Sequence, residues 1–376
     1  MHTTPPLITG HCDTRFASVR DAFAENFTQR GDVGAAVALF VDGEVVVDLT
    51  GGWADRERSR QWQSDTVVNV WSSTKGVAAA CFAMLMDGGR ATYEDPVALH
   101  WPEFEAEGKG AVTIAHLLSH QAGLCGFTSP ATVANLLSGG EAAARLAAQA
   151  PFWPLGTGSG YHAITGGILA TELFRRIEGR AIREFVAEEL HGARGLDISI
   201  GLRTSDAPRR AEMLAPSELD SAQIASLTAP QIAALGNPPL DPLLPNNHAW
   251  RQADLPSANG HSNARALAEL YAQLIAANRP LISKTTLAEA TKRRVEGKDL
   301  VLGMPARWGA GFLLNSDGIY GPNEAAFGHS GWGGSFGFAD PSVGLALSYT
   351  MNRMGTQLRD DPRGLALIKA TYDAIG

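Results

Sequence analysis

The chain has 376 residues, of which 45% are hydrophobic and 19% are charged, so it can bury a sizeable core and is not predicted to be disordered. Its formal net charge of −8, without any cluster of lysine and arginine, argues against a protein that binds nucleic acid. Three scattered cysteines are too few for a disulfide framework or a zinc site.

The N-terminus and the hydropathy of the chain indicate where the protein resides. Residues 1–16 contain no apolar stretch of the kind found in signal peptides, and no run is long enough to span a membrane. We therefore expect a soluble, cytoplasmic protein with no membrane partner and no nucleic-acid partner. The sequence predicts no cofactor and no metal, and it leaves the oligomeric state open.

The first part of the chain mixes helix and strand. An amphipathic helix is predicted over residues 13–30, where aromatic and aliphatic residues recur at helical spacing. A β-hairpin follows, with apolar strands at 35–40 and 45–49 joined by an Asp-Gly turn. An extended run at 67–71 then leads into a helix over 72–87, which a pair of glycines ends.

The rest of the chain is first helical and then β-rich. The helices predicted in the middle cover residues 113–120, 132–137, 141–150, 162–176, 182–190, 221–235, 263–277 and 285–293. The strands and closing helix predicted after them cover residues 307–315, 325–329, 335–340, 343–351 and 362–374. We therefore expect an α/β (α+β) fold, in which both chain ends share one antiparallel sheet flanked by helices, beside a mostly helical domain.

The start of the helix at Ser72 carries the first candidate catalytic pair. Ser72 and Lys75 stand three residues apart and share one helix face. Residues 77–86 contain no polar side chain, so this helix must be buried. Burial and the helix dipole both lower the pKa of a lysine there, which makes Lys75 a candidate proton acceptor for the serine hydroxyl. The alternative is that Ser72 or Ser73 caps the helix and Lys75 extends to water.

Two glycine-rich segments are candidates for the remaining parts of a site. Residues 154–160 form a loop that can aim Tyr161 into a cleft, where a phenol near an ammonium has a lowered pKa and can relay a proton. Residues 327–334 place several glycines between two predicted strands, and the N–H of Trp332 can complete an oxyanion hole with that of Ser72. The alternatives are an ordinary loop tyrosine and a glycine-rich β-turn.

Two other motifs match catalytic patterns but lack the required context. Residues 333–337 fit the nucleophile elbow G-x-S-x-G around Ser335, but a strand follows instead of a helix, and no histidine occurs after His329. His116 and His120 have the spacing of zinc peptidases without the catalytic glutamate or a third ligand. We expect Ser335 not to be the nucleophile, and the two histidines to form a hydrogen-bonded structural pair.

Taken in order, these segments resemble the serine β-lactamase and penicillin-binding-protein superfamily, and more closely the family VIII carboxylesterases, which share the class C β-lactamase fold. Ser72–Lys75 matches S-x-x-K, Tyr161–Ala163 the Y-x-N position, and His329–Gly331 the K-T-G position. Further similar stretches are Leu117–Leu124, Ser257–Gly260 and Trp332–Gly334 with the G-x-S-x-G around Ser335. The resemblance runs from about residue 15 to the C-terminus.

The resemblance implies an acyl-enzyme on Ser72, with Lys75 and Tyr161 as its acid–base pair, and it leaves open which of the two first takes the serine proton. The oxyanion hole that it implies consists of the N–H groups of Ser72 and Trp332. The substrate-binding residues that it implies are Gln121, His329, Ser330, Gly331 and Trp332. It also implies a single catalytic module, residues 1–376, with an α/β subdomain at approximately 1–90 and 300–376 and a helical subdomain at approximately 91–299.

Two departures from the β-lactamase pattern favour a neutral ester as substrate. The lysine of K-T-G is replaced by His329, whose ordinary pKa of about 6.5 leaves it mostly neutral near pH 7. The asparagine of Y-x-N is replaced by Ala163. We therefore predict a carboxylesterase for small, short-chain acyl esters, with acyl transfer as a side activity. The alternatives are a β-lactamase or DD-peptidase-type amide hydrolase, and a catalytically idle β-lactamase-like binding protein.

Overall fold

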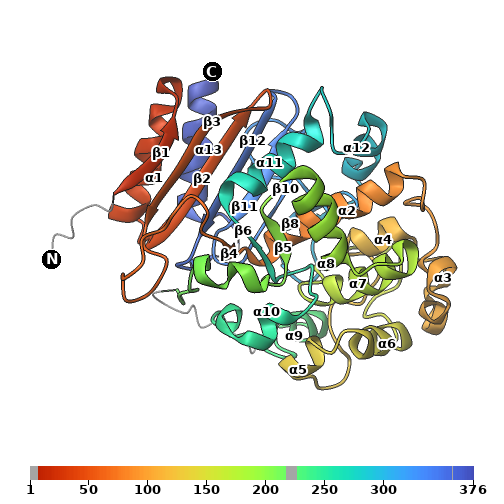
Figure 1. Cartoon of the computed structure of the whole chain (residues 1–376). Coiled ribbons are helices and arrows are strands. Elements are labelled where there is room, and N and C mark those ends of the chain that lie inside the picture. The colour runs from red at the N-terminus through yellow and green to blue at the C-terminus, as the bar shows by residue number, and fades with distance from the viewer. Residues whose placement is uncertain (1–6, 217–226, 358) are drawn as a thin grey trace.

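The computed structural model describes residues 7–216, 227–357 and 359–376, which form a large antiparallel sheet with helices on both faces and a helical region beside it (Figure 1). In spatial order the strands of this sheet are β1 (Ile8–Cys12), β3 (Glu44–Gly52), β2 (Gly34–Val41), β12 (Leu345–Met351), β11 (Phe336–Asp340), β10 (Phe327–Ser330), β9 (Leu313–Leu314), β8 (Pro305–Trp308) and β7 (Val295–Lys298). Both chain ends therefore contribute to one sheet, as predicted.

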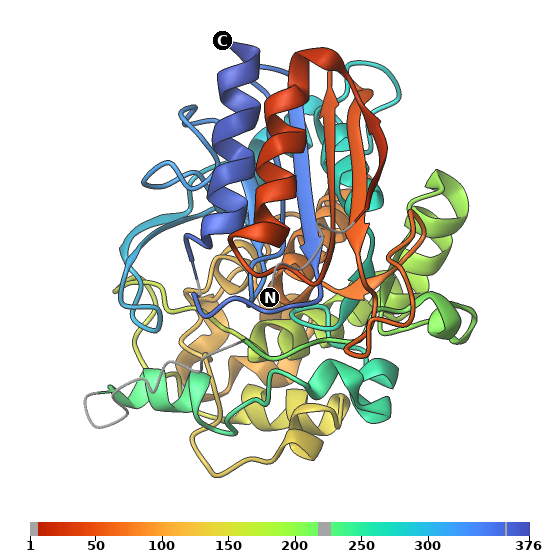
Figure 2. The same cartoon turned by 90° about the vertical axis from the view of Figure 1, so that its left-hand side faces the viewer.

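The centre of the sheet joins the two ends of the chain. Strand β2 pairs with β12 from Val41 opposite Leu345 to Ala35 opposite Met351. Both strands are apolar and almost fully buried, because helices cover both faces of the sheet. Helices α1 (Ala17–Thr28) and α13 (Pro362–Ile375) lie side by side on one face, and α11 (Ala264–Ile275) packs on the other against β2, β11 and β12 (Figure 2).

The strands of the large sheet differ from the prediction at three places. The edge strands β1 and β7 were not predicted, because most of their residues are exposed and show no apolar alternation. The single strand predicted over residues 307–315 is divided into β8 and β9. Gly311, between them, has a φ of +90° and lies so close to α2 that an added Cβ would stand 2.8 Å from the Cβ of Ala79. This close approach ends the strand.

The middle of the chain is helical, as predicted, with shorter elements than expected. Its helices are α3 (Val97–His100), α4 (Ile114–Leu118), α5 (Val133–Leu136), α6 (Gly140–Ala148), α7 (Thr165–Glu178), α8 (Ile182–Phe185), α9 (Ala229–Leu235), α10 (His248–Gln252) and α12 (Lys284–Thr291). A π-helix (Val186–Gly192) continues α8. The helix predicted over residues 221–235 is shorter, since α9 begins at Ala229 after the N-cap Thr228, and residues 221–226 lie outside the described residues. A small second sheet contains β4 (Val68–Asn69), β6 (Gly260–Ser262) and β5 (Ile198–Ile200).

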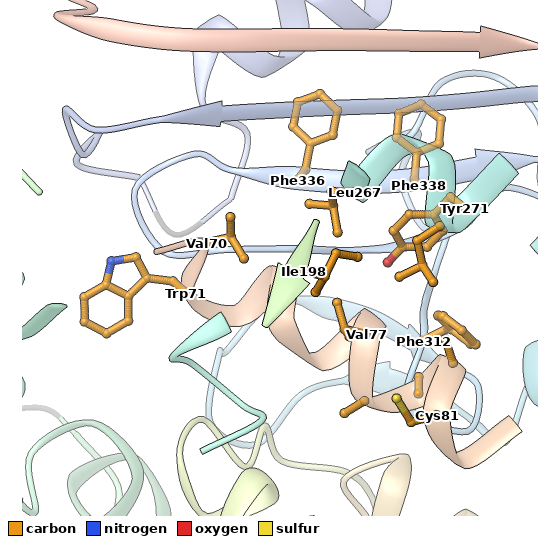
Figure 3. Close-up of a cluster of buried hydrophobic side chains, with 14 of the residues drawn as sticks. Val70, Trp71, Val77, Cys81, Ile198, Leu267, Tyr271, Phe312, Phe336 and Phe338 are labelled. Atoms are coloured by element: carbon orange, nitrogen blue, oxygen red, sulfur yellow. The ribbon is translucent and has the colours of Figure 1, made fainter. Parts of the chain in front are cut away.

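Helix α2 (Thr74–Asp87) lies between the sheet layer and the helical region and is buried on nearly all sides, as its apolar sequence predicted. Val77 and Cys81 of α2 belong to the same core cluster as Tyr271 of α11 (Figure 3). Gly76 permits this packing, since an added Cβ would stand 2.0 Å from the Tyr271 hydroxyl oxygen. The start of α2 is thereby fixed at the junction of the two regions. No helix within the described ranges is long and apolar enough to cross a membrane.

Candidate active site

Ser72 lies in a one-turn 3₁₀ helix (Trp71–Ser73) directly before α2. Its neighbour Trp71 has a φ of +46°, a left-handed conformation that is uncommon for a bulky residue and is held only by strong surrounding contacts. The Trp71 ring packs against those of Trp250 and Trp332, with centroid distances of 5.3 and 4.9 Å. The packing of these three indoles therefore holds the strained turn that carries Ser72.

The alternative interpretation of the S-x-x-K motif is wrong. Ser73 stands at the N-cap position of α2, but its side chain makes no capping hydrogen bond. Its Oγ instead lies 3.1 Å from the Oγ of Ser335. Lys75 does not extend to water, since it is only 7% exposed.

The Lys75 amine is held by backbone carbonyls and faces Ser72. Its Nζ donates to the carbonyl oxygens of Ala163 at 2.7 Å and Ser257 at 2.9 Å, and lies 3.3 Å from Ser72 Oγ. Burial lowers the pKa of Lys75 well below its ordinary value. A neutral amine has two N–H bonds and one lone pair. The two carbonyls accept both N–H bonds, so the lone pair remains for the Ser72 hydroxyl proton.

Tyr161 also lies next to this amine, and Lys75 Nζ stands 4.7 Å from the centroid of its ring. The Tyr161 ring stacks almost parallel to that of Trp308, with an interplanar angle of 8° and a centroid distance of 5.7 Å. Desolvation raises the pKa of the Tyr161 phenol above its ordinary value, although a hydrogen bond with the Ser72 side chain opposes this shift. The lowered pKa expected from a neighbouring ammonium is therefore wrong, because burial dominates and also disfavours the charged form of Lys75.

Strand β10 brings His329 and Ser330 to the same place. His329 is 2% exposed; its Nδ1 bonds the Ser330 carbonyl oxygen at 2.9 Å, and its Nε2 is buried without a partner among the described residues. Burial, together with the nearby Lys75, lowers the pKa of His329 to about 3. The K-T-G position therefore carries a neutral imidazole. Ser330 Oγ lies 3.1 Å from the Tyr320 hydroxyl.

The turn after β10 presents the second donor of the expected oxyanion hole. Gly331 must be glycine, since an added Cβ would stand 2.3 Å from the carbonyl oxygen of Val70 and from Ser335 Oγ. The turn is closed by the Gly334 N–H, which donates to Gly331 O at 3.1 Å. The N–H of Trp332 donates to no acceptor within the described chain, and both Trp332 and Ser72 line the same cavity.

Gln121 is the one proposed substrate-binding residue that the structure does not bring to the others. Its side chain is buried and its Nε2 donates to Ser119 Oγ at 2.7 Å. It does not line the cavity that contains Ser72.

The cavity in front of Ser72 has a volume of about 770 Å³, within the range of small-molecule sites. Its walls come from both the helical region and the sheet, the kind of junction at which ligand sites commonly occur. Its described walls are mostly apolar. The apolar residues that line it include Ile164, Leu240, Leu302, Met304, Ile319, Phe336 and Ile368. Ser72, Tyr161 and His329 share this cavity with the Gly331–Trp332 turn.

Several residues that build the site were not predicted from the sequence. Ala163 and Ser257 act through carbonyl oxygens, which leave no side-chain signature. Trp308 supports the Tyr161 ring, and Asp299 Oδ1 accepts the Tyr161 N–H at 2.9 Å. Ala163 and Ser257 had a signal in the sequence, because both lie in stretches that carry the family resemblance, but that signal did not indicate a role for their carbonyl oxygens.

The two motifs that match catalytic patterns without the required context, the histidine pair and the G-x-S-x-G around Ser335, have structural roles. The sequence predicted a hydrogen-bonded pair of His116 and His120, but each of them bonds to another residue. The Nδ1 of His116 accepts the N–H of Thr113 at 3.2 Å in a capping box, and the Nδ1 of His120 accepts the N–H of His162 at 3.2 Å. Within the described ranges no group of histidine, cysteine and acidic residues is arranged to hold a metal ion.

Ser335, at the centre of the elbow-like motif, is 1% exposed and donates to the Val70 carbonyl oxygen at 2.8 Å. We expect Ser335→Ala to keep kcat within a few-fold of the wild-type value. The loss of a buried hydrogen bond should lower the free energy of unfolding by about 1–3 kcal/mol. Steady-state kinetics and urea unfolding measure the two effects. A folded Ser335→Ala protein without activity would restore the elbow interpretation.

The family model described as Beta-lactamase matches residues 19–370. A curated relative, Esterase/beta-lactamase LipL from Mycobacterium tuberculosis, is 34% identical over 362 residues, which are 92% of this chain and 83% of the relative.

Solved structures agree with this assignment. A family VIII carboxylesterase is 44% identical, with a TM-score of 0.92 over 98% of this chain and 100% of the other. A penicillin-binding protein homologue from Caulobacter crescentus is 43% identical, with the same TM-score and coverage. The fold predicted from the sequence and the resemblance that carried it are confirmed. The chain belongs to the beta-lactamase family.

Proposed function

We propose that the protein is a serine carboxylesterase that hydrolyses uncharged esters through an acyl-enzyme on Ser72. The observation that carries this proposal is the buried Lys75 amine, which donates to two carbonyls and lies 3.3 Å from Ser72 Oγ. Two similar proteins support an ester as the substrate. The relative from Mycobacterium tuberculosis is named an esterase/beta-lactamase, and the solved structure that is 44% identical to this chain is a family VIII carboxylesterase.

In the proposed reaction Ser72 Oγ bonds to the ester carbonyl carbon while its proton moves to Lys75 Nζ. The N–H groups of Ser72 and Trp332 stabilise the negative oxygen that develops. The ester C–O bond then breaks as the Tyr161 phenol gives its proton to the leaving alkoxide, and the Lys75 ammonium returns a proton to Tyr161. Water releases the acid by the same steps in reverse, and an alcohol in place of water would give acyl transfer.

The opposite pKa shifts of the two partners support this division of roles. A lowered pKa makes Lys75 a neutral amine that can accept a proton, and a raised pKa keeps Tyr161 a phenol that can donate one. The hydrogen bonds of Lys75 support the same division, because its two N–H groups donate to the two carbonyls and only its lone pair can accept a proton from Ser72. We therefore assign the first proton transfer to Lys75.

The charges in the cavity support an uncharged substrate. His329 is neutral where β-lactamases carry the K-T-G lysine. Arg359 is the only basic residue among the described cavity walls besides His329, and its guanidinium donates to the carbonyl oxygens of Pro305 and Ser316 at 2.8 Å each. No free cation therefore awaits a substrate carboxylate among these residues. The apolar walls favour esters with apolar groups.

One assay tests this function against its alternatives. The purified protein is offered a p-nitrophenyl ester of a short-chain acid and a chromogenic cephalosporin, with Ser72→Ala as the control. We expect ester turnover that Ser72→Ala removes, and weaker cephalosporin turnover. Dominant cephalosporin turnover would support a β-lactamase instead. Absence of turnover, together with no labelling by a fluorophosphonate, would support an idle binding protein.

The pH dependence of kcat/KM follows from the same assignments. Activity needs neutral Lys75, so it should fall with decreasing pH through an ionisation well below the ordinary lysine pKa of about 10.4. It also needs protonated Tyr161, so the alkaline limb should lie above about pH 10. His329 is already neutral above its pKa of about 3. The pH–rate profile of His329→Gln should therefore keep both the acid and the alkaline limb. An acid limb near pH 6.5 that is present in the wild type and absent from this variant would contradict the assignment of the acid limb to Lys75.

We also propose that the two subdomains expected from the sequence act as one catalytic module. Ser72 comes from the expected α/β subdomain, Tyr161 from the expected helical subdomain, and His329 from strand β10 of the large sheet. The walls of the cavity belong to both regions, so neither region alone would retain the site.

A further inference from the structure

We propose that Asp299 is a positioning residue that holds Tyr161 in the geometry needed for proton transfer. This inference rests on the proposed function, because it assigns Asp299 a role through the proton donor of that reaction. Asp299 does not line the cavity and does not touch Ser72 or Lys75. Its effect would reach the reaction through Tyr161.

The carboxylate joins two segments that have little regular structure. Asp299 Oδ1 accepts the backbone N–H groups of Tyr161, Val301 and Leu302, each at 2.9 Å. The N–H of Leu300 also donates to Ser159 O at 2.8 Å. Residues 158–162 belong to no helix or strand, so these bonds supply the fixed contacts that helical or sheet hydrogen bonds supply elsewhere. One oxygen atom thus fixes the backbone that carries the phenol.

The same carboxylate also supports the Tyr161 ring through Trp308. Asp299 Oδ2 and Trp308 Nε1 are both buried, and neither has a hydrogen-bond partner at ordinary distance and angle among the described residues. The Trp308 N–H is near enough to lower the pKa of Asp299, against the larger raising effect of burial. Trp308 stacks on Tyr161 at 5.7 Å. Asp299 therefore bonds the backbone of Tyr161 and lies near the side chain on which the Tyr161 ring rests.

The negative charge of Asp299 is not needed to accept the backbone N–H of Tyr161. Asp299 is 0% exposed, and its hydrogen-bond partners are N–H groups rather than a paired cation. Burying an unpaired carboxylate is costly, and an amide would offer the same Oδ1 acceptor without a charge. The charge has one effect that an amide lacks: after burial, which is the largest cause, it adds to the raised pKa of the Tyr161 phenol.

The test combines Asp299→Ala and Asp299→Asn with Tyr161→Phe. In the Tyr161-containing protein, we expect Asp299→Ala to lower kcat for a p-nitrophenyl ester by about 100-fold, the loss typical of a catalytic group displaced by about 1 Å, with KM within about threefold. Asp299→Asn should lower kcat by about tenfold, because Oδ1 remains but the contact with Trp308 is lost. In the Tyr161→Phe background both substitutions should change kcat by less than about threefold, since residues that act as a unit are not additive.

Asp340 offers a matched control. It is also 0% exposed, and its Oδ2 accepts Asn323 Nδ2 at 2.8 Å and the Tyr372 hydroxyl at 2.6 Å, away from the cavity. Asp340→Ala should lower the melting temperature and leave kcat within about threefold of wild type, as expected for a purely structural loss. If Asp299→Ala does not fold, the Asp299→Asn pair decides the question in the same way.

The outcomes separate this inference from the proposed function. Wild-type kcat in Asp299→Asn, or an equal fold-loss with and without the Tyr161 hydroxyl, would overturn the positioning role. Full activity of Tyr161→Phe alone would instead overturn the role of Tyr161 in the proposed reaction. A loss that depends on the Tyr161 hydroxyl would support both.

Discussion

Ser72→Ala should remove ester turnover, lowering kcat by about 10⁴- to 10⁶-fold while the protein stays folded. Among the described residues, Ser72 carries the only serine or threonine hydroxyl that both belongs to the cavity wall and lies within hydrogen-bond distance of the Lys75 amine. Without it no acyl-enzyme can form at this position, and only binding and the oxyanion hole remain to accelerate attack by water. Initial rates with a p-nitrophenyl ester, together with a melting curve, measure both parts of this prediction.

Ser73→Ala is the natural control for this variant. Ser73 is adjacent in sequence and fully buried, but its hydroxyl contacts Ser335 instead of the cavity. It should keep a substantial fraction of the activity, with a modest loss of stability. A Ser72→Ala protein that still turns over ester at a rate near that of wild type would show that the nucleophile lies elsewhere.

Lys75→Arg should lower kcat about as far as Lys75→Ala, by about 10³- to 10⁴-fold. Arginine keeps the positive charge but cannot give up its proton in a protein, so it offers no lone pair to Ser72. The larger guanidinium also lacks space, since Lys75 is only 7% exposed and its amine fits between the carbonyls of Ala163 and Ser257. Single-turnover rates of acylation, followed by release of p-nitrophenol, report the affected step.

Lys369→Arg is a matched control, because the side chain of Lys369 is 75% exposed and pairs with Asp373 on the surface of α13. It should leave both kinetics and stability unchanged. If Lys75→Arg retained activity close to that of wild type, a fixed positive charge would suffice at this position, and proton acceptance by Lys75 would be refuted.

Much of the fold was predictable because its signals are local. The apolar runs at both chain ends predicted the shared sheet, and the apolar run of α2 predicted a buried helix. The edge strands β1 and β7 were missed because their exposed residues carry no alternating pattern. The break between β8 and β9 was missed because its cause, the contact of Gly311 with Ala79, joins residues far apart in the sequence.

The candidate site was predictable where side chains carry the chemistry. Ser72, Lys75, Tyr161 and the His329 segment were found through motifs, and they share one region of the structure. Contacts made by backbone carbonyls and by Asp299, which lies 138 residues from Tyr161, have no such signature. The pKa direction of Tyr161 was wrong because it depends on the balance between burial and charge, which requires the folded structure.

The most direct test is to find the atom that carries the acyl group. The protein is mixed with a fluorophosphonate or a slowly released ester, quenched, and digested, and the modified peptide is located by mass spectrometry. We expect one adduct per chain, on Ser72, and no labelling of Ser72→Ala. An adduct on Ser335 or any other residue, or ester turnover without a covalent intermediate, would contradict the assignment of Ser72 as the nucleophile.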